Sequence, residues 1–449
     1  MTGVTAEDGS HAEDGSLTDA RAVPEARSLP EAQSLVEAEA EARREADPFR
    51  AHRWSPRVRW RLIPWWGRVA LIYAASRVVT TVILLQFAAA QAPNAWTDAR
   101  PGLFEYSNLW DARWYALIAF GWYPSELPVG DSGHVGENQW AFLPVFPALI
   151  RAMTTFGVQT EVATVLIATA AGLGAALVLH RLMSRFLEPD RAMFAVVLFC
   201  VAPVSPILQF GYAESLGFLG IAIALLLLVD RRYGWLVPVV AVWAFTRPGT
   251  LAFALTLGLH WIVRFATRRT DPFPVRDRVV VALVAVFTAI MGLAWPVIAW
   301  IATGDPAAYF DTELAWRAAY IGYGELVPFT AWFEGAQWWI GGAVGPIGSA
   351  VAVIALAVAF ALVLFLPAVR RLGTDIRLWL ASYGLYLFAV FFPQSSTFRL
   401  LAPMFPLVGA LAVPRARWYR WSIVVVFLAL QVGWLWICWV IDGRDWTPP

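Results

Sequence analysis

The sequence has little charge, no lysine and almost no cysteine. Only 15% of its 449 residues are charged, whereas 59% are apolar and the mean hydropathy is +0.58. A soluble globular domain is closer to half apolar and a quarter charged. A soluble enzyme, a nucleic-acid-binding protein with a basic face and a secreted disulfide scaffold are therefore excluded. What remains is an integral membrane protein that crosses the bilayer several times.

Other chemistries are absent as well. The two cysteines, Cys200 and Cys438, lie in apolar segments without CxxC spacing, which indicates packing rather than a disulfide or a metal site. No group of His, Asp and Glu has metal-ligand spacing, and neither a P-loop nor a dinucleotide-binding glycine pattern is present. We expect no cofactor, no tightly held metal and no nucleotide-sugar site. The use of arginine for all 34 basic residues is typical of a GC-rich genome and favours a bacterial source.

The N-terminal segment differs from the rest of the chain. Residues 1–47 contain 12 acids against four arginines, a repeated AEDGS motif and no aromatic residue. Such a composition buries too little apolar surface to fold, and it lacks the apolar core of a signal peptide. We predict a disordered tail over residues 1–60, acidic and then basic, with a short exposed helix over Glu37–Glu45. A helical domain over residues 61–441 and a short tail over 442–449 follow.

Eleven segments are apolar enough to be membrane-spanning helices. Their ranges are Val69–Ala90, Glu161–Leu182, Ala192–Gln209, Ser215–Val229, Trp235–Phe245, Gly249–Ile262, Val279–Ala302, Gly341–Leu366, Leu378–Phe392, Leu400–Val413 and Ile423–Ile441. We therefore predict an all-α integral membrane fold with about 11 transmembrane helices. The hairpin over Trp235–Ile262 has the shortest arms.

Arginine placement predicts the orientation. If the N-terminus is cytoplasmic, the cytoplasmic segments hold 26 arginines and the outer segments hold seven, in agreement with the positive-inside rule. Counting Phe142–Thr155 as a full span would place the arginine-rich loops outside. We therefore assign Ala141–Phe156 to an interfacial or re-entrant segment, and we expect the protein in the plasma membrane with its N-terminus in the cytoplasm.

Polar residues gather on the predicted outer side. Two long loops, residues 91–140 and 303–340, lie there, together with the turns 210–215, 246–249 and 393–399. Ionisable groups at bilayer depth are costly, so by default they pair with one another or serve a site. A carrier more often has polar groups near mid-membrane on several helices. This distribution therefore favours an extracytoplasmic active site.

The first outer loop contains the most informative acid, Asp111. It sits beside a stripe formed by Trp110, Trp114, Leu117 and Ile118, which predicts an amphipathic helix in the membrane interface. Asp111 either caps this helix or pairs with the nearby Arg113, or it takes part in chemistry. Spacing alone leaves both a structural and a chemical role of Asp111 open.

Five blocks of the sequence resemble, in order, the motifs of the PIG-V-like mannosyltransferases, which belong to the GT-C class of multi-pass glycosyltransferases. The blocks are Trp110–Tyr115 (followed by Ile118-Ala119 and Tyr123-Pro124), Ala141–Pro147, Tyr212–Leu216, Thr246–Gly249 and Phe398–Leu407. The resemblance extends from about Arg68 to Val413. It departs at Trp122, where the family usually has glycine.

The resemblance implies a GT-C-type helical bundle with its active site outside and a long first outer loop that carries amphipathic helices. GT-C enzymes take a sugar from a polyprenyl-phosphate carrier and invert its anomeric centre in one displacement. Such a reaction needs a base for the acceptor and positive charge at the phosphate. We expect Asp111 to be the general base, and Arg247 and Arg399 to bind the donor phosphate.

Other residues of these motifs are expected to support the site, namely Trp110, Arg113, Tyr115, Tyr212 and Glu214. Glu214 would orient an arginine or bind a sugar hydroxyl. Glu105 and His134 are alternatives for the base or for a metal ligand. Arg77, within the first helix, is expected to be structural.

The function implied is transfer of mannose from polyprenyl-phosphate-mannose, the lipid-linked co-substrate, to a hydroxyl group of a glycolipid, lipoglycan or other acceptor. The expected partners are the lipid bilayer, this donor and a glycan acceptor, and not nucleic acid. Two alternatives remain open: a GT-C enzyme for another polyprenyl-linked sugar, and a non-catalytic lipid-linked-sugar flippase or scaffold. A flippase should have polar groups lining the interior of several helices, which this sequence does not favour.

Overall fold

The computed structural model describes residues 33–34, 36–41, 60, 62–131, 133–442 and 447–449. The chain divides into two compact units, Met1–Ile63 and Pro64–Pro449. In the first unit, residues 36–41 are helical and mostly exposed, where a short helix was expected over Glu37–Glu45. Most of the predicted acidic tail, and residues 443–446 of the predicted C-terminal tail, lie outside the described residues.

The second unit contains five helices that are long and apolar enough to cross a membrane. They are α3 (Trp65–Ala90), α7 (Thr160–Met183), α12 (Val275–Thr303), α14 (Ala331–Val363) and α19 (Arg417–Trp439). Each has at least 23 residues, more than the roughly 20 that cover the hydrocarbon core. α14 is kinked at Gly345, which has a non-helical φ of 72° and directly precedes Pro346. The predicted all-α, multi-pass membrane fold is confirmed.

The other six predicted spans coincide with shorter helices or with broken helical segments. These elements are α8 (Pro189–Val201) with η2 (Ser205–Leu208), α9 (Glu214–Val229), α10 (Leu236–Ala244), α11 (Thr250–Ala266), α16 (Gly373–Val390), and the segment α17 (Thr397–Leu401), η4 (Ala402–Leu407) and α18 (Val408–Leu411). Proline explains the breaks: α8 ends just before Pro203, and Pro403 and Pro406 coincide with the 3₁₀ turns of η4.

The connections carry short helices of their own. The first predicted outer loop contains α4 (Leu103–Tyr106), α5 (Asp111–Gly121) and η1 (Gln139–Ala141), and α6 (Val145–Thr155) follows it. The second contains α13 (Ala308–Ile321); η3 (Tyr233–Trp235) and α15 (Pro367–Arg370) lie in other connections. In the described part of the chain no segment forms a β-strand, apart from an isolated bridge between Val129 and Val135.

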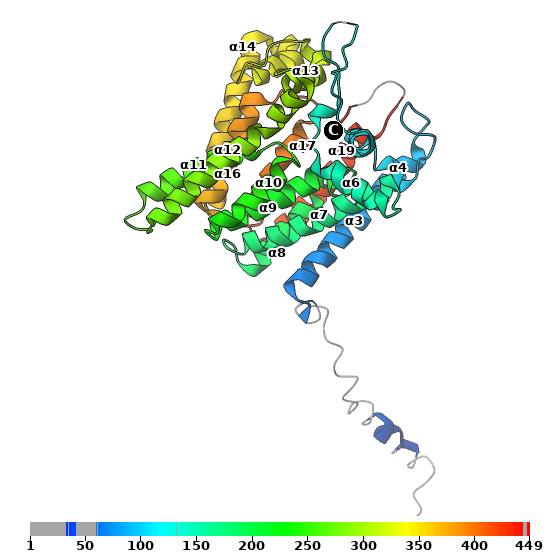
Figure 1. Cartoon of the computed structure of the whole chain (residues 1–449). Coiled ribbons are helices and arrows are strands. Elements are labelled where there is room, and N and C mark those ends of the chain that lie inside the picture. Colours follow the sequence, from blue (N-terminus) through cyan, green and yellow to red (C-terminus); the bar gives the residue numbers. More distant parts are fainter. Residues whose placement is uncertain (1–32, 35, 42–59, 61, 132, 443–446) are drawn as a thin grey trace, which may run out of the picture. The chain divides into compact units, whose positions relative to one another are not determined.

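The core forms where small residues let helices approach closely. α7 packs against α8 and α9, α10 packs against α9, and α11 packs against α12 and α16; Figure 1 shows α7, α9 and α10 side by side. On α7, Ala168, Ala175 and Ala176 are fully buried, and a side chain at Gly172 would collide with the hydroxyl of Tyr73 on α3. This close contact of small residues is typical of helix pairs in membranes.

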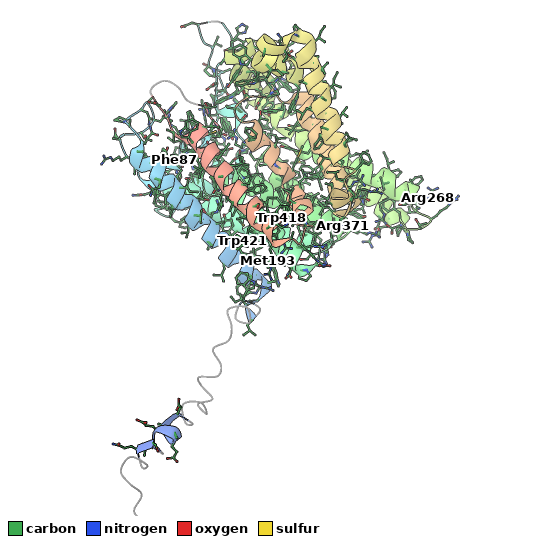
Figure 2. The ribbon with its side chains drawn as sticks, turned by 180° about the vertical axis from the view of Figure 1, so that it is seen from behind. Phe87, Met193, Arg268, Arg371, Trp418 and Trp421 are labelled. Atoms are coloured by element: carbon green, nitrogen blue, oxygen red, sulfur yellow. The ribbon has the colours of Figure 1, made fainter. Side chains whose placement is uncertain are left out.

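Loops that the sequence places on the same side of the membrane contact one another. At the C-terminal end of α9, Asp230 pairs with Arg185, and Arg231 pairs with Asp271. Glu188, just before α8, pairs with Arg415, just before α19. Figure 2 shows Arg371, Trp418, Trp421 and Met193 toward one end of the helices and Phe87 toward the other. The arginine-rich loops therefore gather at one end of the unit.

Candidate active site

Asp111 occupies the first position of α5. The helix starts abruptly because Trp110 has a positive φ of 57° and its indole nitrogen donates to the Cys438 carbonyl at 2.9 Å. A carboxylate at a helix N-terminus is stabilised by the helix dipole. Asp111 is thus the first residue of the helix and not its N-cap. The N-cap position is occupied by Trp110, whose side chain makes no capping hydrogen bond.

The partner of Asp111 is Arg399, and not the neighbouring Arg113. The Arg399 guanidinium donates to the Asp111 carboxylate at 2.5 Å, across 288 residues of sequence. Arg399 lies on α17, directly after the polar turn at residues 393–396. The guanidinium also lies over the ring of the fully buried Tyr212, 5.4 Å from the centroid. The first and last sequence blocks are therefore joined by an ion pair.

Glu214 connects a second arginine to this pair. It is the first residue of α9, only 4% of it is exposed, and its carboxylate lies 3.0 Å from Arg247 and 3.5 Å from Arg399. Arg247 projects from the turn between α10 and α11, where Gly249 adopts a φ of 137° that favours glycine. Arg247 also donates to the hydroxyl of the buried Tyr115 at 3.4 Å. The four charged side chains alternate in sign along one chain of contacts.

These four charged residues line one cavity of about 440 Å³. Charges removed from water are costly unless each has a partner, and here each acid contacts an arginine. Two fully buried tyrosines contact the arginines of this cluster: Tyr115 accepts a hydrogen bond from Arg247, and the ring of Tyr212 lies under Arg399.

Other predicted residues lie elsewhere. Arg113 is exposed and stacks over Trp96, 4.1 Å from the ring centroid, and does not line the cavity. Glu105 is exposed on α4, and His134 stacks on Tyr323. Arg77 donates to the carbonyls of Ser205 and Cys200, which fits the structural role expected for it.

The cavity also contains polar residues that sequence reasoning did not single out, and three of them come from one helix. Tyr309, Glu313 and Arg317 lie on α13 in the second outer loop, at i, i+4 and i+8, so they share one face of that helix. The Tyr309 hydroxyl hydrogen-bonds the Glu313 carboxylate. Burial raises the pKa of Glu313, and the nearby Arg317 only partly offsets this effect. The helical spacing within a predicted outer loop was the signal that could have found them.

A second cavity of about 450 Å³ lies beside the first, and Trp295 lines both. It is mainly aromatic, with Trp122, Tyr123 and Trp140 among its lining residues. Trp122, at the position where the PIG-V-like family usually has glycine, adopts a φ of 61° and a ψ of −147°. Such a conformation costs a non-glycine residue on the order of 1–3 kcal/mol. The departure from the family pattern thus falls on a position whose backbone favours glycine.

Among the described residues, no three His, Cys, Asp or Glu side chains are grouped so that they could hold a metal ion. The arrangement offers instead carboxylates that can accept a proton and arginines that can bind an anion. Both are gathered in a partly enclosed space with aromatic walls.

Comparison with protein-family models gives no match, and comparison with curated proteins gives none either. Among solved structures, the chain is similar to an oligosaccharyltransferase of Archaeoglobus fulgidus, crystallised with a tethered acceptor peptide. The identity is 12% and the TM-score is 0.36. The match covers 81% of this chain but only 55% of the other protein. A similarity of this size does not establish a shared activity.

Proposed function

We propose that this protein is a membrane glycosyltransferase of the GT-C class that transfers mannose from polyprenyl-phosphate-mannose to a hydroxyl group of a glycolipid, lipoglycan or other acceptor. The observation that carries the proposal is the cluster of Asp111, Arg399, Glu214 and Arg247 at one cavity. These residues come from four of the sequence blocks that resemble the PIG-V-like family. The reaction is proposed to take place on the outer face of the plasma membrane.

The proposed reaction is a single inverting displacement. The acceptor oxygen forms a bond to C1 of the mannose while the bond from C1 to the phosphate oxygen breaks. The proton of the acceptor hydroxyl passes to Asp111, and the bonding electrons leave with the polyprenyl phosphate. Asp111 is the proposed base because it is an acid of the signature and lines the cavity.

The ion pair between Asp111 and Arg399 suggests how the two substrates are coupled. A phosphate that binds to Arg399 competes with the Asp111 carboxylate for the same guanidinium. Once the phosphate takes this contact, the Asp111 carboxylate is free to accept a hydrogen bond from the acceptor hydroxyl. Donor binding thus prepares the base for the acceptor, and without donor the carboxylate is held in the ion pair.

The test is turnover by the purified, membrane-inserted protein with polyprenyl-phosphate-mannose, and with the glucose and arabinose donors for comparison. Asp111→Asn keeps the size of the side chain but cannot take the proton. General-base catalysis is worth about 10²–10⁴-fold, so turnover should fall by that factor. Glu105→Gln is the matched control, because this acid lies exposed on α4 outside the cavity. Its turnover should equal that of the wild type.

Each contrary result has a distinct meaning. Transfer of glucose or arabinose in preference to mannose would replace the donor but keep the GT-C proposal. Movement of the lipid-linked sugar across vesicles without transfer would favour the flippase. If Asp111→Asn keeps more than about a tenth of wild-type turnover, far above the loss expected for a base, Asp111 is misassigned.

A further inference from the structure

Three arginines line the cavity that contains Asp111, namely Arg247, Arg317 and Arg399, and they differ in the groups they contact. Arg247 and Arg399 both contact Glu214, and Arg399 also contacts Asp111. Arg317 forms no ion pair with any described carboxylate. Its guanidinium donates instead to the backbone carbonyl of Val390, at 2.5 Å. A carbonyl carries only a partial charge, so Arg317 keeps a full positive charge and further N–H donors.

The electrostatics of the two arginine positions differ in the same way. Burial lowers the pKa of Arg317, and the carboxylates of Glu313 and Glu334 only partly compensate for it. The pKa of Arg247 is instead raised, because its attraction to Glu214, Tyr115 and Asp111 outweighs its own burial. Arg317 therefore has less compensating negative charge around it than Arg247 has.

Arg317 is nevertheless close to the rest of the site. Both Glu313 and Tyr386 interact electrostatically with Arg247 as well as with Arg317. An anion in this part of the cavity can therefore interact with both arginines. Burial raises the pKa of Glu313, which favours its neutral form.

The surroundings of Arg317 also indicate what kind of anion fits. The cavity beside it is lined by apolar residues of the α13–α14 connection and the end of α16, including Leu326, Val327 and Val390. Val327 and Val390 are partly exposed apolar residues, at 50% and 42%. A free phosphate gains nothing from such a lining, whereas a phosphate attached to a hydrocarbon chain buries apolar surface against it.

We propose that Arg317 is the principal anchor of the donor lipid's phosphate group, with Arg247 and Arg399 completing the site around it. The proposal rests on the proposed function, and it adds to the active site a residue of α13 outside all five family-like blocks. The guanidinium holds the phosphate by charge-assisted hydrogen bonds, while the first atoms of the hydrocarbon chain pack on the apolar lining. When the sugar leaves, Arg317 stabilises the additional negative charge on the phosphate.

The experiment measures equilibrium binding of three probes to the full chain in detergent micelles: decaprenyl monophosphate, decaprenol and inorganic phosphate. We compare the wild type with Arg317→Gln and Arg317→Lys. Arg100→Gln is the matched control, since Arg100 is an exposed arginine of the first outer loop that does not line the cavity. The thermal unfolding midpoint of every variant is measured in parallel.

The wild type should bind decaprenyl monophosphate more tightly than either other probe. Hydrogen bonds to a charged group are worth about 1.5–3 kcal/mol, so Arg317→Gln should weaken this binding roughly 10- to 100-fold. Its binding of decaprenol should not change. Arg317→Lys should recover part of the loss because it keeps the charge, and Arg100→Gln should behave as the wild type.

Four results would overturn the inference. Unchanged binding of the lipid phosphate by Arg317→Gln would remove Arg317 from the site, while the wild-type preference for the phosphate would leave the proposed function standing. An equal loss of decaprenol binding would mean that the substitution acts on the fold. A lysine variant as weak as the glutamine variant would show that charge is not what binds. Tighter binding of inorganic phosphate than of the lipid would reject the lipid source. A wild type that does not distinguish decaprenyl monophosphate from decaprenol would instead contradict the proposed donor itself.

Discussion

The two ends of α9 carry the same kinds of charged pair in opposite environments. At its C-terminal end, Asp230 pairs with Arg185, and these side chains are 21% and 51% exposed. At its N-terminal end, Glu214 pairs with Arg247, and these are 4% and 17% exposed. The helix has 16 residues, so roughly 24 Å separates the two pairs.

The difference shows what each set of charges does. Exposed ion pairs contribute about 0–1 kcal/mol to stability. The arginines at the arginine-rich end therefore act mainly on the orientation of the protein in the membrane. Buried pairs lose hydration that the attraction between charges barely replaces. A buried cluster of four charges is therefore a poor device for stability. Its presence at one cavity is better explained by binding and chemistry.

The largest expected contrast is between the two sides of the membrane. Reporter fusions after Arg232 or Arg371 should give a cytoplasmic signal, and fusions within residues 91–140 or 303–340 should give an external one. The reason is the distribution of 26 arginines against seven. The measurement is the activity ratio of a paired periplasmic and cytoplasmic reporter. A cytoplasmic signal from the first loop would place the cavity on the wrong side for the proposed reaction.

The second contrast compares the two ends of α9 directly. Glu214→Gln leaves Arg247 and Arg399 without this buried counter-charge, and breaking a buried ion pair costs about 3–5 kcal/mol. Asp230→Asn at the other end should cost less than about 1 kcal/mol. Denaturant or thermal unfolding of the two variants checks the prediction. Equal losses would mean that burial is not what separates the two ends.

The third contrast is in the sign of the pH dependence. Burial raises the pKa of Glu313, so the unfolded chain loses this proton at a lower pH than the folded protein does. This group therefore lowers stability as the pH rises above about 4.3, the usual glutamate value. At the arginine-rich end of the unit, the hydrogen bond from Arg415 lowers the pKa of Glu188, the residue before α8. Its contribution is present above the unfolded value and is lost as the pH falls through its folded pKa.

Unfolding midpoints of wild type, Glu313→Gln and Glu188→Gln between pH 4 and pH 8 test this prediction, with the unfolded glutamate value of about 4.3 near the lower limit. Glu313→Gln should gain on the wild type as the pH rises. Glu188→Gln should differ from it least at the acidic end of the range. A Glu313→Gln protein that follows the wild type at every pH would show that the folded and unfolded chains ionise this group alike.

The smallest effect is expected from the N-terminal tail. Deletion of residues 2–47 removes an acidic segment predicted to lie on the side away from the chemistry. Turnover of the truncated protein should stay within about twofold of wild type, a difference under 0.5 kcal/mol. Insertion is checked by the same reporter fusions. A truncated protein that inserts normally yet loses activity would assign the tail a docking or regulatory role.

Hydropathy predicted the helices well because it is a local property. Every predicted span falls on helical structure, since a run of apolar residues must satisfy its backbone hydrogen bonds internally to lie in lipid. Their ends were predicted less well. The segment Leu400–Val413 reads as one apolar span, yet Pro403 and Pro406 divide it into an α-helix, a 3₁₀ segment and a further short helix.

Part of the site was also readable from the sequence. Asp111 was singled out in the first outer loop, and Glu214, Arg247 and Arg399 in the outer turns, all within blocks that resemble the PIG-V-like motifs. The structure brings all four to one cavity. Their roles in catalysis and binding stay predictions. Charge in an apolar sequence is informative because it is expensive to bury.

The sequence by itself determined which segments are apolar helices, on which side arginine gathers and which polar residues stand out. Only the tertiary structure decided which of these residues contact one another. Asp111 pairs with Arg399, 288 residues away, and not with Arg113, two residues away. Residues two apart on a helix do not face each other, whereas packing brought the start of α5 to α17. In the same way, α13 places Glu313 and Arg317 at the cavity. Besides its chain neighbours α12 and α14, it packs against η1, where Asn138 donates to Thr312, 174 residues away, and no local pattern records this contact.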